Sequence, residues 1–259
     1  MIKRGDDNNP LGELIYNSMS IIDIIREKQR LAILSAPNLA PQKHQPDMLY
    51  IGCIDARLDP ITDIGIPKGK ALIFRNIGAL VSKDESGRDT LDGEAAMSGG
   101  EIPQNVSIGA ALEFFLNHIP LEHGKVKHIV IAAHTDCGGL KACQHGAYGD
   151  QDHHLPLYLK CLEEVRTKVM DDANSNGWDN AQVLDALEKE SVRQSMANLL
   201  SYPVVRNAID QGKLELHGWI IDTTTQHISE MNLQTLGFAS MSAKRGTSAR
   251  TASTTDRHR

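Results

Sequence analysis

Four short apolar runs constrain the fold of this chain more than any other feature. They are M-L-Y-I-G-C at 48–53, A-L-I-F at 71–74, H-I-V-I-A-A-H at 128–134 and L-E-L-H-G-W-I-I-D at 214–222. Continuous apolar runs of this length are typical of strands that are buried on both faces. Helical patterns lie between the runs, and this alternation predicts an α/β fold with a mainly parallel central sheet flanked by helices.

Apolar residues at helical spacing predict the elements around these strands. Residues 11–35 carry apolar side chains at intervals of three and four, which predicts an N-terminal helical arm. Three prolines between residues 37 and 46 then mark a loop before the first strand. Further helices are predicted from Ser107, which suits an N-cap, over 156–172 and over 180–201.

The domain organisation follows from where these patterns stop. Residues 82–106 are polar and rich in glycine, which predicts a connection longer than usual that is either functional or mobile. Near the C-terminus the chain becomes basic, rich in Ser and Thr and almost free of apolar side chains. We expect residues 1–240 to form a single domain and residues 241–259 to be a disordered tail.

The composition argues against several classes of protein. The 259 residues are 41% hydrophobic and 23% charged, as in ordinary soluble globular proteins. The formal net charge of −6 argues against nucleic-acid binding, which needs clustered Lys and Arg. No apolar run approaches the roughly 20 residues that span a bilayer, and the N-terminus lacks the apolar core of a secretory signal. The expected location is therefore the cytoplasm, with no membrane partner.

The segment C-I-D-A-R at 53–57 places reactive groups at the end of the first predicted strand. In extended backbone, Cys53, Asp55 and Arg57 lie on one face because successive side chains alternate between faces. A packing face seldom carries an acid and a base together. This segment therefore predicts a functional site.

A second segment, H-T-D-C-G-G at 134–139, supplies metal-binding residue types. His134 ends the third predicted strand, and Cys137 follows three residues later. Ligands of parallel sheets bind at the carboxyl ends of strands, so Cys53 is expected nearby. Two thiolates and one imidazole suit tetrahedral Zn²⁺ and leave one position open, as in catalytic zinc sites.

The two segments together resemble the β-class carbonic anhydrases, which pair C-x-D-S-R with H-x-x-C-G. Between them, F-R-N-I-G-A-L-V resembles the family's R-N-x-x-N-L-V, and S-I-G-A-A-L-E-F-F resembles its following helix. The resemblance runs from about residue 12 to residue 231.

The resemblance implies the reversible hydration of CO₂ to bicarbonate and a proton, with zinc bound by Cys53, His134 and Cys137. It also implies that Asp55 and Arg57 form the catalytic dyad. The N-terminal arm would join two subunits, giving a homodimer or a multiple of dimers.

The chain departs from the family pattern at several positions. Ala56 replaces a serine next to the dyad, and His44 stands where many members line the pocket with glutamine. Tyr50 and Ile221 replace two aromatic residues of the family's regulatory bicarbonate pocket. That replacement favours an open site, in which Asp55 faces Arg57, over a closed site in which it binds zinc.

Three other interpretations stay open at this point. The same scaffold could hydrolyse CS₂ or COS, or it could be a zinc-binding scaffold subunit with weak catalysis. Alternatively, a cysteine could act as a nucleophile with His134, although this leaves a second cysteine unexplained. Cys143, Cys161 and His128 are interpreted as ordinary packing or surface residues.

Overall fold

The structure is a computed structural model that describes residues 20–30, 44–84, 106–146 and 152–241, without positions 24, 27, 28 and 123. The chain divides into two units, Met1–Lys43 and His44–Arg259. In the first unit, the described residues after Ser20 are helical, and Ser20 Oγ accepts a hydrogen bond from the Asp23 N–H at 3.2 Å. This agrees with the predicted arm over these residues, and the rest of 11–35 lies outside the described part.

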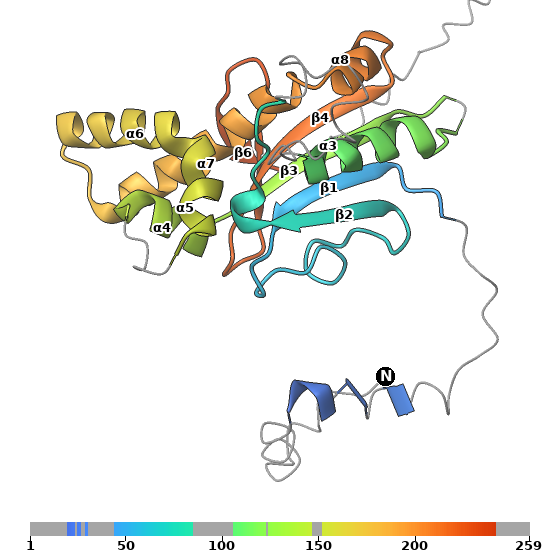
Figure 1. The fold of residues 1–259 in the computed structure, drawn as a ribbon, viewed down its shortest axis with the longest axis horizontal. Coiled ribbons are helices and arrows are strands. Elements are labelled where there is room, and N and C mark those ends of the chain that lie inside the picture. The colour runs from blue at the N-terminus through green and yellow to red at the C-terminus, as the bar shows by residue number, and fades with distance from the viewer. Residues whose placement is uncertain are drawn as a thin grey trace, which may run out of the picture. The chain divides into compact units, whose positions relative to one another are not determined.

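One six-stranded sheet with the order β2-β1-β3-β4-β5-β6 forms the centre of the second unit (Figure 1). The strands are β1 Met48–Cys53, β2 Ala71–Asn76, β3 Lys127–His134, β4 Leu214–Ile221, β5 Ile228–Met231 and β6 Phe238–Ser240. The first four strands pair in parallel, and β5 and β6 add an antiparallel edge. The predicted α/β fold with a mainly parallel sheet is confirmed.

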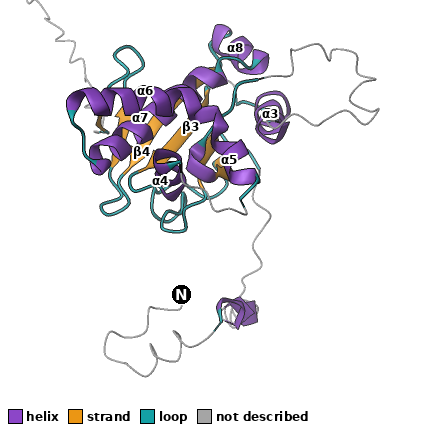
Figure 2. Cartoon of the chain, turned by 60° about the vertical axis from the view of Figure 1, so that its left-hand side comes forward, coloured by secondary structure: helices purple, strands orange, loops and turns teal. Residues whose placement is uncertain are grey.

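Helices and short helical turns connect these strands. They are η1 Ile77–Ala79, α3 Val106–Glu113, η2 Phe114–His118, α4 Gly138–His145, α5 His154–Leu159, η3 Lys160–Leu162, α6 Glu163–Asn176, α7 Asn180–Leu199 and α8 Pro203–Asp210. Figure 2 shows helices α4, α6 and α7 lying in front of the strands. Among the described residues, no helix is long and apolar enough to cross a membrane.

The central strands are buried on both faces, as their continuous apolar runs predict. On one face, Ile51 and Ile131 pack in a cluster with Leu112, Val192 and Val205 from α3, α7 and α8. On the other face, residues of the β1–β2 connection pack against β1 and β3. The sheet is thus fixed from both sides, which holds the ends of β1 and β3 in place.

The helical predictions were partly wrong at their boundaries. The segment predicted over 156–172 is divided into α5, η3 and α6, which ends only at Asn176. The helix predicted over 180–201 ends at Leu199, because the chain turns before a new helix begins with Pro203 at its first position. Ser107 is the second residue of α3 and therefore not its N-cap.

Two further predictions fall mainly outside the described residues. Of the predicted 82–106 loop, the structure describes residues 82–84 and Val106, the first residue of α3. Of the predicted tail at 241–259, it describes Met241 alone. Both assignments stay predictions.

Candidate active site

The candidate site lies where the order of the parallel strands reverses. β2 pairs with one edge of β1, whereas β3 pairs with the other edge. Open α/β sheets bind ligands at such a switch point, outside the carboxyl ends of the strands. Gly52 is in register with Ala132, so Cys53 and His134 end their strands at the same edge of the sheet.

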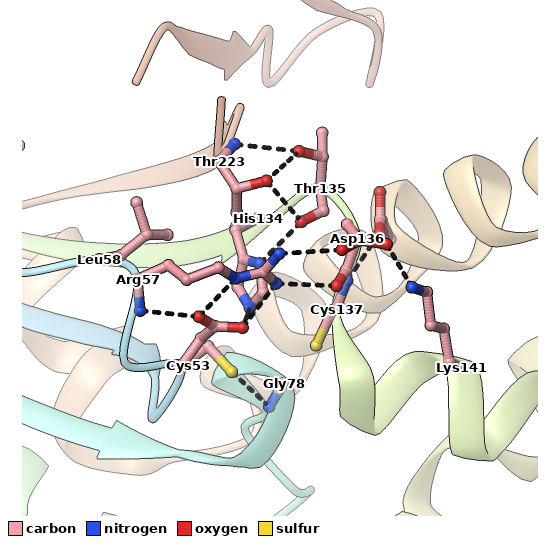
Figure 3. Close-up of polar contacts among 12 residues, drawn as sticks. Cys53, Arg57, Leu58, Gly78, His134, Thr135, Asp136, Cys137, Lys141 and Thr223 are labelled. Carbon is pink, nitrogen blue, oxygen red and sulfur yellow. Dashed lines mark hydrogen bonds and ion pairs between the residues drawn. The ribbon is translucent and has the colours of Figure 1, made fainter. Parts of the chain in front are cut away.

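The structure brings the three predicted ligand residues together (Figure 3). One ligand atom each from Cys53, His134 and Cys137 lie within 4.8 Å of one another. Nδ1 of His134 lies 2.9 Å from the Thr135 carbonyl oxygen, so Nδ1 carries the proton and Nε2 presents a lone pair. Among the described residues, this Nε2 is the only buried side-chain nitrogen or oxygen without a hydrogen-bond partner.

These residues fit a zinc ion by their chemistry. Sulfur and imidazole nitrogen are the donors that zinc takes from proteins, and three ligands leave a fourth position open. A buried polar atom without a partner costs about 1–3 kcal/mol. A metal ion bound at Nε2 of His134 would remove that cost, so the orphaned nitrogen itself points to a missing partner.

The two thiols have very different affinities for a proton. Pairing with Cys137 lowers the pKa of Cys53, with smaller contributions from His134 and the Gly78 N–H and against an opposing effect of burial. The Gly78 nitrogen lies 3.4 Å from Cys53 Sγ. The same pairing and burial raise the pKa of Cys137, which precedes the first residue of α4. Of the two thiols, Cys53 therefore loses its proton more readily.

Asp55 and Arg57 form a two-pronged ion pair beside these ligands. Arg57 Nε donates to Asp55 Oδ1 at 2.9 Å, and Nη2 donates to Oδ2 at 2.8 Å. These hydrogen bonds hold the pKa of Asp55 well below its usual range. Its Oδ2 lies 3.7 Å from Nε2 of His134, so an ionised carboxylate faces the candidate metal ligands.

Asp136 completes the Arg57 environment, although the sequence analysis did not identify it. Arg57 Nη1 donates to its Oδ2 at 2.9 Å, and Nη2 donates to its carbonyl oxygen at 3.0 Å. Lys141 of α4 makes a further ion pair with the Asp136 carboxylate. Asp136 has φ 63°, a left-handed conformation that Asp tolerates better than most residues. Its position between His134 and Cys137 was the only available signal.

Two more groups support the loops that carry the ligands. Arg75 donates to the carbonyl oxygens of Cys53, Asp55 and Leu58 at 2.7, 2.6 and 3.0 Å, which fixes the segment after β1. Glu188 of α7 is 3% exposed, and its Oε1 accepts the Cys137 N–H at 3.2 Å. Burial raises the pKa of Glu188 to about 7. A charged residue on the apolar side of a predicted helix was the signal for this role.

The remaining residues of the sequence analysis contribute no atom to this ligand cluster. Cys143 is buried and Cys161 is half-buried within the helical layer. Tyr50 and Ile221 are both buried in the cluster beneath the sheet. His44 is exposed.

Fold and site together define a class of protein: an α/β protein with a Cys₂His cluster and a paired carboxylate at a topological switch point. Residues 48–228, more than half of the chain, match the family described as carbonic anhydrase. The chain therefore belongs to the carbonic anhydrase family, and its resemblance to the β class is confirmed.

Related proteins share this similarity at modest identity. A carbonic anhydrase of Synechococcus elongatus is 29% identical over 72% of this chain and 60% of its own length. One from Pseudomonas aeruginosa is 28% identical over 77% of this chain and 79% of its own length. The chain thus spans less than two thirds of the first relative.

Solved structures show the same fold. The β-carbonic anhydrase CcaA has a TM-score of 0.63 at 21% identity, with 90% of this chain and 93% of that chain covered. A tetrameric β-carbonic anhydrase of Sordaria macrospora has a TM-score of 0.59 at 24% identity, covering 85% and 98%. At these identities the similarity shows the fold alone.

Proposed function

We propose that the protein is a zinc-dependent carbonic anhydrase, which catalyses the reversible hydration of CO₂ to bicarbonate and a proton. One observation carries the proposal. The unpartnered Nε2 of His134 lies within a Cys–His–Cys cluster and 3.7 Å from the ionised carboxylate of Asp55. The match of residues 48–228 to the carbonic anhydrase family supports it.

In this proposal Cys53, His134 and Cys137 bind the zinc ion. Zinc held there would lower the pKa of a bound water from about 15.7 to about 7. Asp55 would orient the attacking oxygen by accepting its hydrogen bond at Oδ2. Arg57 keeps Asp55 ionised, because its two hydrogen bonds favour the charged carboxylate.

We propose the open arrangement of the site for the same reason. Both carboxylate oxygens of Asp55 are engaged by Arg57, and Arg57 is held in turn by Asp136. For Asp55 to bind the metal, the two-pronged pair with Arg57 would have to break. Charge-assisted pairs of this geometry are among the stronger hydrogen bonds in proteins.

Metal content and CO₂ hydration, measured on the same preparations, test the proposal. Cys53→Ser should lose the zinc bound at this cluster, whereas Asp55→Asn should keep it and lose about 10²-fold in hydration rate, a typical effect of removing one oriented polar group. Cys161→Ser is the matched control, since its Sγ donates only to the Tyr158 carbonyl at 3.3 Å and a hydroxyl can do the same.

The outcomes separate the interpretations. Full zinc content in Cys53→Ser would refute the metal assignment. Normal zinc with turnover of CS₂ or COS but not of CO₂ would favour the hydrolase alternative. Normal zinc without any of these activities would favour a scaffold subunit.

We further propose that the helical arm joins two subunits, giving a dimer or a multiple of dimers. In the described part of the arm, Ile21, Ile22 and Ile25 are 67%, 51% and 47% exposed, which leaves apolar surface for a partner to cover. The Sordaria macrospora relative is tetrameric. Light scattering of the full chain tests this, and a monomer at micromolar concentration would refute it.

The proposed location is the cytoplasm. Cys53, Cys137, Cys143 and Cys161 are all free thiols, which suits a reducing compartment. Cell fractionation tests this location. The single domain over residues 1–240 also stays a proposal, and limited proteolysis of the full chain tests it.

A further inference from the structure

A second cluster of metal-binding side chains lies at the opposite end of the sheet. Glu215 and His217 alternate with apolar residues in β4, so their side chains share one face. His128, near the start of β3, is in register with Glu215 on the same face. The parallel pairing of β3 and β4 therefore brings two imidazoles and a carboxylate together at the amino ends of these strands.

The spacing of the ligand atoms suits one ion. His128 Nδ1 and His217 Nε2 are 3.1 Å apart and share a hydrogen bond, which a bound ion would replace, and Glu215 Oε2 lies 3.7 Å from the first and 4.0 Å from the second. Zinc bound by nitrogen and oxygen at about 2.0–2.1 Å in tetrahedral geometry separates its ligand atoms by about 3.3 Å. A shift of less than about 1 Å in the Glu215 side chain would complete this arrangement. Glu215 is 60% exposed, so its side chain has room to move.

A neighbouring carboxylate fixes the His217 ring for metal binding. The His217 Nδ1 lies 2.9 Å from Glu230 Oε1, and Trp219 Nε1 donates to the same oxygen at 3.3 Å. Glu230 is itself in register with Trp219 on the adjacent strand β5. A carboxylate can only accept, so Nδ1 carries the proton and Nε2 turns a lone pair toward His128. Metal-ligating histidines in proteins characteristically have this carboxylate partner.

The charges around the cluster favour a cation. Glu215 and Glu230 add two negative charges. The half-exposed position of the rings leaves the site open to ions from solvent.

We propose that His128, Glu215 and His217 bind a divalent transition-metal cation of the zinc type, at a site separate from the candidate active site. Two imidazoles and one carboxylate form a ligand set that zinc uses in other proteins. The bound ion would link β3 to β4 at their amino ends. This proposal does not depend on the proposed carbonic anhydrase activity.

Zinc stoichiometry of the full chain, measured by equilibrium dialysis and elemental analysis, tests the proposal. We expect two equivalents in the wild type, one in His217→Gln and one in His128→Asn. His227→Gln is the matched control, because His227 contacts Ser240 and not this cluster, and it should keep two. Equal stoichiometry in the wild type and both cluster variants would overturn the proposal.

Cobalt substitution distinguishes this site from the thiolate site. Co²⁺ bound by cysteine gives a thiolate charge-transfer band, whereas Co²⁺ bound by His and Glu does not. Cys53→Ser should lose the charge-transfer band and keep a second Co²⁺ equivalent, and His217→Gln should do the reverse. A charge-transfer band that persists in Cys53→Ser would count against the proposed active site and leave this one intact. Loss of both Co²⁺ equivalents in Cys53→Ser would count against this second site.

A more conservative variant separates loss of metal binding from loss of the folded structure. Glu230→Gln keeps a hydrogen-bond acceptor for His217 but removes the charge, and loss of such a supporting carboxylate weakens metal affinity by about 10–100-fold. We expect at least tenfold weaker Zn²⁺ binding at the second site with an unchanged far-ultraviolet spectrum. Unchanged Zn²⁺ affinity in this variant and in Glu215→Gln would refute the assignment of the ligands.

Discussion

Replacing Gly139 with alanine tests how closely the two loops of the candidate site are packed. Gly139 is the second residue of α4, and a Cβ there would lie 2.4 Å from Cγ2 of Ile77. Carbon atoms in ordinary contact lie about 3.5–4.0 Å apart, so the overlap is about 1 Å. Ile77 begins η1, and the next residue, Gly78, donates its N–H to Cys53 Sγ. The clash is therefore transmitted to a candidate metal ligand.

We expect Gly139→Ala to lower the free energy of unfolding by about 1–3 kcal/mol, the usual cost of overpacking. Its neighbour Gly138 provides the matched control. A Cβ at Gly138 meets nothing within 4 Å, so Gly138→Ala should lose no stability. Alanine at a helical position can even add up to about 1 kcal/mol relative to glycine.

Urea unfolding in the presence of a chelator measures the packing effect without the metal, and zinc titration then measures the effect on the site. Gly139→Ala should also bind zinc more weakly than Gly138→Ala, because Gly78 and Cys53 must shift. Ile77→Ala should relieve the clash, so the double variant should cost less than the sum of the two single changes. Free energies of unfolding within about 0.5 kcal/mol for the two glycine variants, the range of an ordinary surface change, would refute the reasoning.

Three other predictions concern groups around the two clusters. Glu188→Ala should lower the free energy of unfolding by about 1–3 kcal/mol, because the buried Cys137 N–H loses its acceptor. Glu188→Gln keeps an acceptor and should be nearly neutral. Urea unfolding of both variants measures the difference. The lowered pKa of His128 means that the folded chain binds fewer protons than the unfolded chain below about pH 6.5, so stability should fall as pH drops through that value. His128→Asn should reduce this pH dependence. If the unfolding midpoint fell equally between pH 7.5 and pH 5 in the wild type and in His128→Asn, the prediction would be contradicted. Asp136→Asn should keep the left-handed backbone and the zinc content but slow CO₂ hydration, because it weakens the ion pair with Arg57. Asp136→Ala should in addition lower the free energy of unfolding by about 1–2 kcal/mol, measured by thermal unfolding.

The central strands could be predicted because burial on both faces requires apolar residues, which are visible in the sequence. A strand covered on both faces needs apolar residues along its buried middle, and β1 and residues 129–133 of β3 satisfy this condition. The edge strands β5 and β6 do not, since I-S-E-M and F-A-S are short and partly polar. β5 forms because β4 offers it a free edge, and β6 pairs in turn with β5, so that information lies in the tertiary structure.

The ligand residues could be predicted because each stands at the end of an apolar strand or next to a helix start. Their supporting groups could not be predicted in the same way. Glu188 lies 51 positions after Cys137, and only the packing of α7 brings its carboxylate to the Cys137 N–H. Asp136 reaches Arg57 through a left-handed backbone conformation that no residue pattern specifies.

The contact of His128 with Glu215 and His217 could likewise not be predicted from the sequence. It was interpreted as an ordinary residue because its neighbours in the chain carry no metal-binding pattern. Glu215 and His217 lie almost ninety positions later, and the register of β3 with β4 supplies the contact. Parallel pairing of distant segments is therefore the source of both clusters, with β1 and β3 forming one and β3 and β4 the other.

Strand β3 contributes a histidine to each cluster, and its geometry decides whether the two proposed metal sites act on each other. His128 and His134 lie six residues apart on the same face, which in a strand corresponds to about 20 Å. Effects of changes more than about 7–10 Å apart without shared partners usually add. Charge interactions at 20 Å also exceed the screening length of about 8 Å at physiological salt. Loss of either cluster should therefore leave the metal affinity of the other unchanged, and a shift in both affinities from one substitution would mean that the sheet itself had been distorted.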